Sequence, residues 1–498
     1  MQYISTRNKK ITASSPQAIV KGLADDGGLF VPLKFPSMSR ADFDTLLELD
    51  YAGRAEFIMA KFLPELKSDL AEFTKNAYSK FDDDDASPLI KVDDGLYFLE
   101  LWHGPTYAFK DVALTILPLL LAKSKELVGD SYKTLILVAT SGDTGKAALE
   151  GFKDANGINV LVLYPTDGVS NLQKLQMQTT TGGNVKVLGL HGNFDDAQSA
   201  VKDIFGDSKL TEELKRNNIN LSSANSINIG RLIPQVAYYF SAYADMIDSG
   251  NIKFGDKVNF CVPTGNFGNI LAGYYALQMG LPIGKLVCAS NKNNVLTDFF
   301  NKGTYSLKRE FYKTSSPSMD ILISSNLERL VFEISGRDDL LTAKRLKGLS
   351  SGGDYCLTKD EQQKLSNLFW AGFASEEEAF GALGQAFDEY GYIMDTHTAV
   401  AYSVYNDYVK ATKDKTPCVI VSTASPYKFV KDVLFAIGEQ PTGNDKKDIF
   451  LLEDLTALPI PETLSQLFKM PILHKDILDK EDIKDAVLKY SKEIGAKK

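Results

Sequence analysis

Short, continuous apolar runs alternate with amphipathic stretches along much of the chain. The run KTLILVAT, which begins at residue 133, is bounded by turn residues and is followed by the helix-like stretch TGKAALEGFK. The runs INVLVLYP and NVKVLGL repeat this unit, the second of them ahead of a helix predicted over residues 194–205. Strands that are apolar throughout and alternate with helices predict a parallel sheet covered on both faces.

A second series of alternating elements follows a long predicted helix, IGRLIPQVAYYFSAYADMI. It contains KVNFCVP, a helix after Gly268, KLVCAS and, further on, PCVIVSTAS, which leads into the helical pattern YKFVKDVLFAI. A stretch of mixed character, residues 302–395, interrupts the series, and no segment repeats another. The predicted fold class is therefore α/β, with two doubly wound, mainly parallel sheets and an N-terminal extension.

Changes in this pattern divide the chain into three predicted domains. Residues 1–95 form an N-terminal extension domain that ends near FDDDDASP, where four successive acidic residues favour a solvated loop over a cation site. Residues 133–229 form a small α/β domain. Residues 96–132 and 230–498 form a large domain, with an insertion at about 302–395.

Composition narrows the classes of partner. The chain has 498 residues, 44% of them hydrophobic and 24% charged, which is ordinary for a globular protein with a large core. The formal net charge of -9 argues against nucleic acid or an anionic membrane as the main partner, although a small anion can still bind locally. The most apolar run, VALTILPLLLA, is shorter than the roughly 20 residues of a membrane span and contains Pro118.

The cysteines and the N-terminal segment indicate the cellular compartment in which the protein is expected to act. The four cysteines are far apart in the sequence and show no CxxC or Cys/His spacing, which indicates buried thiols in a reducing compartment. The segment MQYISTRNKK lacks the apolar core of a signal peptide, and no HExxH motif or carboxylate cluster indicates a metal. We expect a soluble, cytoplasmic protein without a metal site, and the sequence leaves monomer and homodimer open.

Lys110 has unusual surroundings in the segment HGPTYAFKDVA. It follows a phenylalanine, precedes an aspartate and adjoins an apolar run. Burial of an ammonium group is costly and lowers the pKa of lysine. Lys110 therefore either extends to solvent or serves as an amine that can lose its proton, and no other lysine shows comparable surroundings beside glycine-rich loops.

Three loops are predicted at the carboxyl ends of strands, where ligands bind in such folds. The first, ATSGDTGKAA, runs into a helix whose exposed amides and dipole favour an anion. A Walker A loop is excluded, because Thr140 stands where that motif has its first glycine and Ala147 replaces the Ser/Thr that binds magnesium. A plain strand-to-helix turn is the alternative.

The second and third loops add further polar groups at strand ends. In VPTGNFGNILAG, Gly265 and Gly268 allow the close backbone approach typical of a phosphate cradle, although the spacing is not GxGxxG. In VSTASPYKF, three hydroxyl side chains lie at a strand end, where they can also cap the next helix. One desolvated lysine, one phosphate cradle and one anion loop match the requirements of pyridoxal phosphate, whose aldehyde forms a Schiff base with a neutral lysine.

The sequence also resembles the threonine synthase family, pyridoxal-phosphate enzymes of fold type II, in the group of tryptophan synthase β. The segments AIVKGLADDGGLFVP, HGPTYAFKD, ATSGDTG, SANSINIGRLIPQ, PTGNFGN, SPSMDILISSNLERL and DTHTAVAY are similar to that family's in order and spacing. The resemblance extends nearly end to end and is to the family's longer form. It implies a fold type II architecture with pyridoxal 5'-phosphate as cofactor.

Carried over residue by residue, the resemblance implies a cofactor site and a carboxylate site. Lys110 would bind the cofactor covalently, and Thr423 would face its pyridine nitrogen with a hydroxyl group. Asp143 stands where many relatives have asparagine, which leaves its contact to the ring hydroxyl open. The implied phosphate cradle is Gly265, Asn266, Phe267, Gly268 and Asn269, and the implied loop for the substrate carboxylate is Ser141, Gly142, Asp143, Thr144 and Gly145.

The reaction that the resemblance implies is conversion of O-phospho-L-homoserine and water to L-threonine and phosphate, with Lys110 as general base. The substrate then needs a second phosphate pocket. Candidates for it are Ser226, Asn228 and Arg231, with Lys146 and His103 as further ones. A salt-bridged helix residue is the alternative interpretation of Arg231, and a buried, hydrogen-bonded residue that of His103.

Two other functions stay open at this point. A phospho-lyase would use the same cofactor and substrate but release 2-oxobutyrate, and the motifs separate it poorly from a synthase. A cofactor-binding protein without turnover predicts a degraded lysine or cradle, whereas both are intact. His397, in DTHTAVAY, is interpreted as structural at a helix start capped by Asp395 or Thr396.

Overall fold

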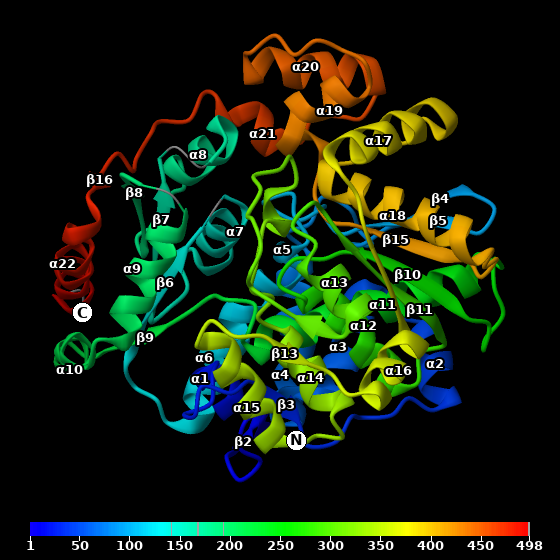
Figure 1. The fold of residues 1–498 in the computed structure, drawn as a ribbon. Coiled ribbons are helices and arrows are strands. Elements are labelled where there is room, and N and C mark those ends of the chain that lie inside the picture. Colours follow the sequence, from blue (N-terminus) through cyan, green and yellow to red (C-terminus); the bar gives the residue numbers. More distant parts are fainter. Residues whose placement is uncertain (141, 167–168, 193, 497–498) are drawn as a thin grey trace.

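The computed structural model describes residues 1–140, 142–166, 169–192 and 194–496. Two mainly parallel sheets lie side by side, and helices surround both of them (Figure 1). This architecture confirms the predicted α/β fold class. Ser141, one of the predicted site residues, lies outside the described residues.

The larger sheet has six strands in the order β14-β11-β10-β15-β5-β4, and all neighbours are parallel except β4 and β5. Alternate side chains of β10 enter different apolar clusters: Phe260 packs with helix α12, and Cys261 packs with helix α18. The sheet is therefore covered on both faces. Its elements are β4 (Leu89–Asp93), β5 (Leu96–Glu100), β10 (Val258–Pro263), β11 (Ile283–Ser290), β14 (Phe369–Phe373), β15 (Cys418–Ser422), α5 (Lys110–Leu114), α6 (Leu117–Val128), α11 (Ile229–Asp248), α12 (Gly268–Met279), α17 (Glu376–Tyr390) and α18 (Thr396–Thr412).

The smaller sheet has five strands in the order β16-β8-β7-β6-β9, and all its pairings are parallel. Ile136 and Val160 pack toward α7, whereas Leu135 and Leu161 pack toward α9 and α22. The elements are β6 (Lys133–Ala139), β7 (Ile158–Pro165), β8 (Val185–Leu190), β9 (Ile219–Ser222), β16 (Ile477–Leu478), α7 (Asp143–Phe152), α8 (Asn171–Gln178), α9 (Phe194–Gly206), α10 (Ser208–Arg216) and α22 (Ile483–Ala496).

Two segments differ from the predicted domain plan. Strand β16 pairs with β8, and α22 covers the small sheet, so the C-terminal segment belongs to that sheet and not to the large domain (Figure 1). Strand β14, inside the predicted insertion 302–395, extends the large sheet next to β11. Both strands pair with partners far away in the sequence, which local patterns do not reveal. The remaining boundaries stay predictions.

The N-terminal residues form a small antiparallel sheet, β2-β1-β3, with helices that pack on the large domain. Tyr51 and Ile58 of α3 share one continuous apolar cluster with Phe240 of α11. The elements of this part are β1 (Gln2–Ser5), β2 (Thr12–Ser14), β3 (Phe30–Pro32), α1 (Ser15–Lys21), α2 (Arg40–Leu47), α3 (Tyr51–Phe62) and α4 (Lys67–Tyr78).

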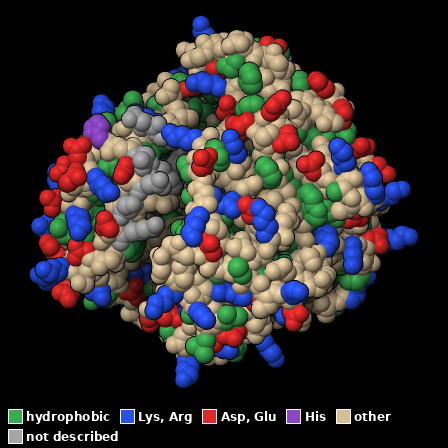
Figure 2. All heavy atoms as spheres, viewed as in Figure 1, with side chains coloured by type: hydrophobic (Ala, Val, Ile, Leu, Met, Phe, Trp, Pro, Cys, Tyr) green, Lys and Arg blue, Asp and Glu red, His purple; other side chains and the backbone are tan. Residues whose placement is uncertain are grey.

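The remaining elements lie around the large sheet. They are α13 (Val295–Lys302), β12 (Thr304–Tyr305), α14 (Leu327–Ile334), α15 (Asp339–Ser350), β13 (Tyr355–Cys356), α16 (Lys359–Leu368), α19 (Val430–Ala436), α20 (Asp445–Thr456) and α21 (Glu462–Leu467). Among the described residues, no helix is long and apolar enough to cross a membrane. Acidic and basic side chains are interspersed over the face in Figure 2.

Candidate active site

A cavity of about 360 Å³ opens at the carboxyl ends of strands from both sheets. Its walls include Ala139 at the end of β6, Pro263 at the end of β10 and Thr423 just after β15. This is the position at which parallel α/β sheets bind ligands. The predicted residues that line it are Lys110, Thr144, Ser226, Arg231, Gly265, Asn266, Phe267, Gly268, Asn269 and Thr423.

Lys110 begins helix α5 at the end of a loop with a fixed shape. The Asp111 carboxylate accepts hydrogen bonds from the Thr106 backbone amide, at 2.7 Å, and from the Thr106 hydroxyl, at 2.6 Å. A Cβ atom at Gly104 would lie 2.4 Å from the Asp111 side chain, so the loop requires glycine there. Burial raises the pKa of Asp111 to about 6. The loop thus holds Lys110 in place before any ligand arrives.

The amine of Lys110 lies in a buried cluster of charges. Its Nζ atom is 3.9 Å from Asp143 Oδ2, and Asp143 Oδ1 is 2.9 Å from Lys428 Nζ. Burial lowers the pKa of Lys110, and the cations of Lys428 and Arg231 lower it further against the attraction of Asp143. Burial alone would raise the pKa of Asp143, but attraction to Lys428 and Lys110 outweighs it and holds the pKa below the ordinary value.

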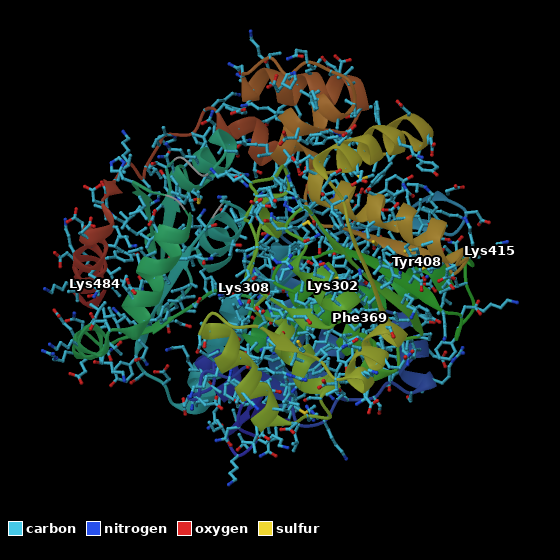
Figure 3. All side chains as sticks on the ribbon, in the orientation of Figure 1. Lys302, Lys308, Phe369, Tyr408, Lys415 and Lys484 are labelled. Atoms are coloured by element: carbon cyan, nitrogen blue, oxygen red, sulfur yellow. The ribbon has the colours of Figure 1, made fainter. Side chains whose placement is uncertain are left out.

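Surface lysines differ from these two. Lys415 extends from the edge of the molecule into solvent (Figure 3), whereas the side chain of Lys428 is 0% exposed and that of Lys110 is 11% exposed. The prediction that no lysine matches the surroundings of Lys110 is therefore wrong. Lys428 lies in the one-turn helix after β15, Pro426–Phe429. It shares the sequence signal of Lys110, because it also stands between an aromatic residue and an apolar helix.

The segment after β10 has the form of an anion cradle. Phe267 adopts a left-handed backbone conformation with φ +64° and precedes the first turn of α12. A Cβ atom at Gly265 would lie 2.6 Å from the carbonyl oxygen of Ser318, so only glycine fits there. The free amides at the start of α12 consequently face the cavity, as an anion requires.

Two buried donors beside the cavity have no partner among the residues that the structure describes. The hydroxyl groups of Tyr238 and Tyr239 both donate to Asn269 Oδ1, which leaves Asn269 Nδ2 buried and unsatisfied. Arg231 donates from Nη1 to the Ala224 carbonyl oxygen, and its Nε atom has no acceptor. Burial lowers the pKa of Arg231 to about 10. Buried donors are normally satisfied, so both atoms call for an anionic or oxygen-rich ligand.

Other predicted residues lie outside the cavity wall. The Thr140 hydroxyl accepts from the backbone amides of Gly142 and Gly145, both at 2.9 Å, and so closes the loop before α7. Asn228 donates to the Ile19 carbonyl oxygen and accepts from Gly230 at the start of α11, which occupies both ends of its amide. Lys146 is bound to Glu150 and Thr180.

His397 borders the cavity in an arrangement that fits its structural interpretation. The Asp395 carboxylate caps α18 by accepting from the His397 and Thr398 backbone amides. It also bonds His397 Nδ1 at 2.7 Å, and His397 Nε2 accepts from the Ser318 backbone amide. Because Nε2 accepts, the ring carries its proton on Nδ1. The histidine thus fastens the Ser318 loop against the cradle.

His103 is bound on both sides, which leaves no ring nitrogen for a substrate. Its Nδ1 atom lies 2.8 Å from Asp82 Oδ1, and its Nε2 atom lies 2.9 Å from Glu100 Oε2. Burial alone lowers the pKa of His103, but the hydrogen bonds to Asp82 and Glu100 outweigh it and raise the pKa to about 9. The imidazolium ring therefore joins the acidic loop to the start of the lysine loop.

We expect the variant His103→Gln to lose stability below pH about 6.5 but not above pH about 9. A raised pKa means that the stabilisation is complete below the unfolded-state value and disappears as pH rises through the folded-state value. The expected loss is about 1–3 kcal/mol in the free energy of unfolding, measured by urea titration on both sides of this window. The control is His191→Gln, at an exposed position, and equal losses at all pH values would contradict the expectation.

Comparison with known proteins gives three family models that match the chain. They are described as threonine synthase N terminus, over residues 2–78, pyridoxal-phosphate dependent enzyme, over residues 84–342, and threonine synthase, C-terminal, over residues 398–487. Together they cover most of the sequence and all the strands of the cavity wall.

Similar sequences and structures are found as well. Threonine synthase-like 1 of Homo sapiens is 40% identical over 479 residues. The aligned region covers 92% of this chain but only 64% of the length of that relative. Threonine synthase of Saccharomyces cerevisiae is 35% identical over 97% of both chains. The pyridoxal-phosphate-bound threonine synthase of Brucella melitensis has a TM-score of 0.88 at 34% identity over 100% of both chains, and the yeast structure has a TM-score of 0.86 at 34% identity over 98% of both.

Proposed function

The chain belongs to the threonine synthase family of pyridoxal-phosphate-dependent enzymes, and on this premise we propose that it converts O-phospho-L-homoserine and water into L-threonine and phosphate. It would thus act as a carbon–oxygen lyase on a phosphate ester in threonine biosynthesis. The observation that carries the proposal is the cavity itself: a buried amine, Lys110, shares its walls with two unsatisfied donors, Asn269 Nδ2 and Arg231 Nε.

The residues of the cavity fit pyridoxal phosphate. Lys110 would hold it covalently, and the backbone amides of residues 265–269 with Asn269 Nδ2 would hold its phosphate, which supplies the acceptor that this nitrogen lacks. Thr423 would meet the ring nitrogen with a hydroxyl, which does not keep a proton there as a carboxylate would. When bound, the cofactor supplies the electron-withdrawing ring that makes protons on the substrate's Cα and Cβ removable.

Lys110 is the residue that would move protons. Its neutral Nζ would remove the Cα proton and then a Cβ proton of the substrate. Phosphate would leave from Cγ, which would gain one of these protons, and Lys110 would return the other to Cα. Water would add its oxygen at Cβ and pass its released proton to the phosphate. The lowered pKa of Lys110 supports this role, since an ammonium group cannot act as a base.

Arg231 and Ser226 would bind the phosphate of the substrate, because both line the cavity and Arg231 Nε has no acceptor in the described part of the chain. Thr144, with the loop before α7, would receive the substrate carboxylate at the start of that helix. Two separate anion sites in one cavity, one for the cofactor and one for the substrate, would favour a phosphorylated substrate over an unphosphorylated amino acid. Ser141, which lies outside the described residues, would belong to the same carboxylate loop.

The test is a single incubation of the pyridoxal-phosphate-saturated protein with O-phospho-L-homoserine. Phosphate, threonine and 2-oxobutyrate are followed together, and homoserine without phosphate serves as the control substrate. We expect threonine and phosphate in equal amounts. Release of phosphate with 2-oxobutyrate would assign a phospho-lyase instead, and no phosphate release would leave a binding protein without turnover.

The proposed partner is this small-molecule substrate, with neither nucleic acid nor a membrane as partner. The mixed surface charges of Figure 2 support the exclusion of nucleic acid. Four free cysteines, three of them buried, support a reducing compartment and so a cytoplasmic site of action. Monomer and homodimer are distinguished by sedimentation of the purified protein.

A further inference from the structure

A second lysine, Lys428, lies beside Lys110 in the same cluster. Its side chain is 0% exposed, and it donates to the Thr106 carbonyl oxygen at 2.7 Å while it pairs with Asp143 at 2.9 Å. Lys428 belongs to the one-turn helix after β15, Asp143 to the start of α7 and Thr106 to the lysine loop. One ammonium group therefore joins three segments that are separated in the sequence, and two of them, the lysine loop and the start of α7, contribute residues to the cavity wall.

The orientation of Asp143 is fixed from two sides. Gln173 of α8 donates from Nε2 to Asp143 Oδ1 at 3.0 Å, the same oxygen that faces Lys428. The other oxygen, Oδ2, faces Lys110 at 3.9 Å. A Cβ atom at Gly142 would lie 2.5 Å from the Gln173 side chain, so this packing also depends on a glycine. The carboxylate is thus shared between two lysines, and only Lys428 contacts it closely.

Charge balance gives this arrangement a chemical meaning. An unpaired carboxylate 3.9 Å from Lys110 would attract a proton onto that amine and hold it there. The other groups that act on Lys110 are Arg231 from α11, which opposes a proton, and Asp111 from α5, which favours one. His397 of α18 also contributes to the lowered pKa of Asp143. Among these groups, Lys428 is the cation in direct contact with Asp143.

We propose that Lys428 is a positioning residue that neutralises Asp143 through their buried ion pair and thereby lets Lys110 lose its proton and work as an amine and base. This inference rests on the proposed function, because it concerns the lysine that binds the cofactor. It also explains how a carboxylate is accommodated 3.9 Å from the amine of Lys110. Lys428 is not among the residues that line the cavity, so in this role it would act through Asp143.

The test measures where the Lys110 nitrogen releases its proton, and it does not depend on turnover. The near-visible absorbance of full-length protein saturated with pyridoxal phosphate is titrated with pH, and its midpoint is compared among variants. Lys428→Met leaves Asp143 unneutralised, so we expect the midpoint to rise by about one pH unit, a tenfold change in proton affinity. Asp143→Asn removes the attraction and lowers the midpoint by a similar amount.

Two further variants separate charge from packing. Lys428→Arg keeps a cation and should leave the midpoint near that of the unaltered protein. The double variant Asp143→Asn with Lys428→Met removes both charges, so its absorbance midpoint should return to that of the unaltered protein. A merely structural lysine would give Lys428→Met a lower melting temperature with an unmoved midpoint, and that result would overturn the proposal. If Lys428→Met does not fold, an unmoved midpoint in Asp143→Asn overturns it equally.

The outcome is separable from that of the proposed function. The absorbance reports the nitrogen of Lys110 whichever product forms, so the shifts can be found in a protein that makes no threonine. Such a result would support the role of Lys428 and reject the synthase activity. If the protein forms threonine and neither Lys428→Met nor Asp143→Asn shifts the absorbance midpoint, only the role of Lys428 is rejected.

Discussion

Replacement of Lys110 by alanine will lower the rate of threonine formation by about 10³–10⁴-fold. The substitution removes both the covalent anchor of the cofactor and the base that moves protons at Cα and Cβ. Stability should change little or improve, because a buried amine with a lowered pKa disappears. The measurement is single-turnover threonine formation with excess pyridoxal phosphate, accompanied by a thermal denaturation curve.

Two controls make the result for Lys110 specific. Lys415→Ala alters a lysine that extends into solvent and should keep full activity (Figure 3). Addition of methylamine to Lys110→Ala should restore part of the rate, because a free amine can replace the missing base but not a lost fold. Activity within tenfold of the unaltered protein would contradict the assignment of Lys110.

Replacement of Arg231 by methionine will lower kcat/KM for O-phospho-L-homoserine by about 100-fold. Arg231 offers a buried Nε that meets no acceptor within the described ranges, and a substrate phosphate would supply that acceptor. Methionine keeps an unbranched side chain of similar length without the charge. We expect KM to rise more than kcat falls, because phosphate binding contributes in the ground state as well as the transition state.

Inorganic phosphate provides an independent measure for Arg231. It should inhibit the unaltered protein in competition with the substrate, and Arg231→Met should weaken this inhibition by a factor similar to the loss in kcat/KM. Arg40→Met is the control, since that arginine is exposed and pairs with Asp44 on the surface. Unchanged kinetics together with a lower melting temperature would contradict a role in phosphate binding. Arg231 would then be a structural residue that donates to the Ala224 carbonyl oxygen.

Features encoded in neighbouring residues could be predicted from the sequence. The run from residue 133 forms β6, and the long helical pattern forms α11, because burial on both faces leaves continuous apolar sequence. The cradle at 265–269 could also be predicted, because its glycines, the end of β10 and the start of α12 are adjacent in the chain. Lys110 was recognisable by its own neighbours.

Features that depend on distant residues could not be predicted in this way. The partnership of Asp143 with Lys428 joins loops on two different sheets, and a lysine beside Phe429 does not by itself indicate its partner. The free donor of Asn269 exists only because two tyrosines of α11 occupy its oxygen. Asn228 was a reasonable candidate by sequence, yet the helix start and Ile19 already use its amide.

The placement of β16 has a consequence for the order in which the protein is made. Strand β8 ends at Leu190, but its outer neighbour, Ile477–Leu478, emerges from the ribosome only much later. At 5–20 residues per second, this delay amounts to roughly 15–60 s. During that time the backbone groups along one side of β8 have no strand to pair with, and open strand edges recruit other chains. The nascent polypeptide therefore exposes this edge until translation has supplied the strand that pairs with Gly189 and Leu190, and faster translation would shorten that exposure.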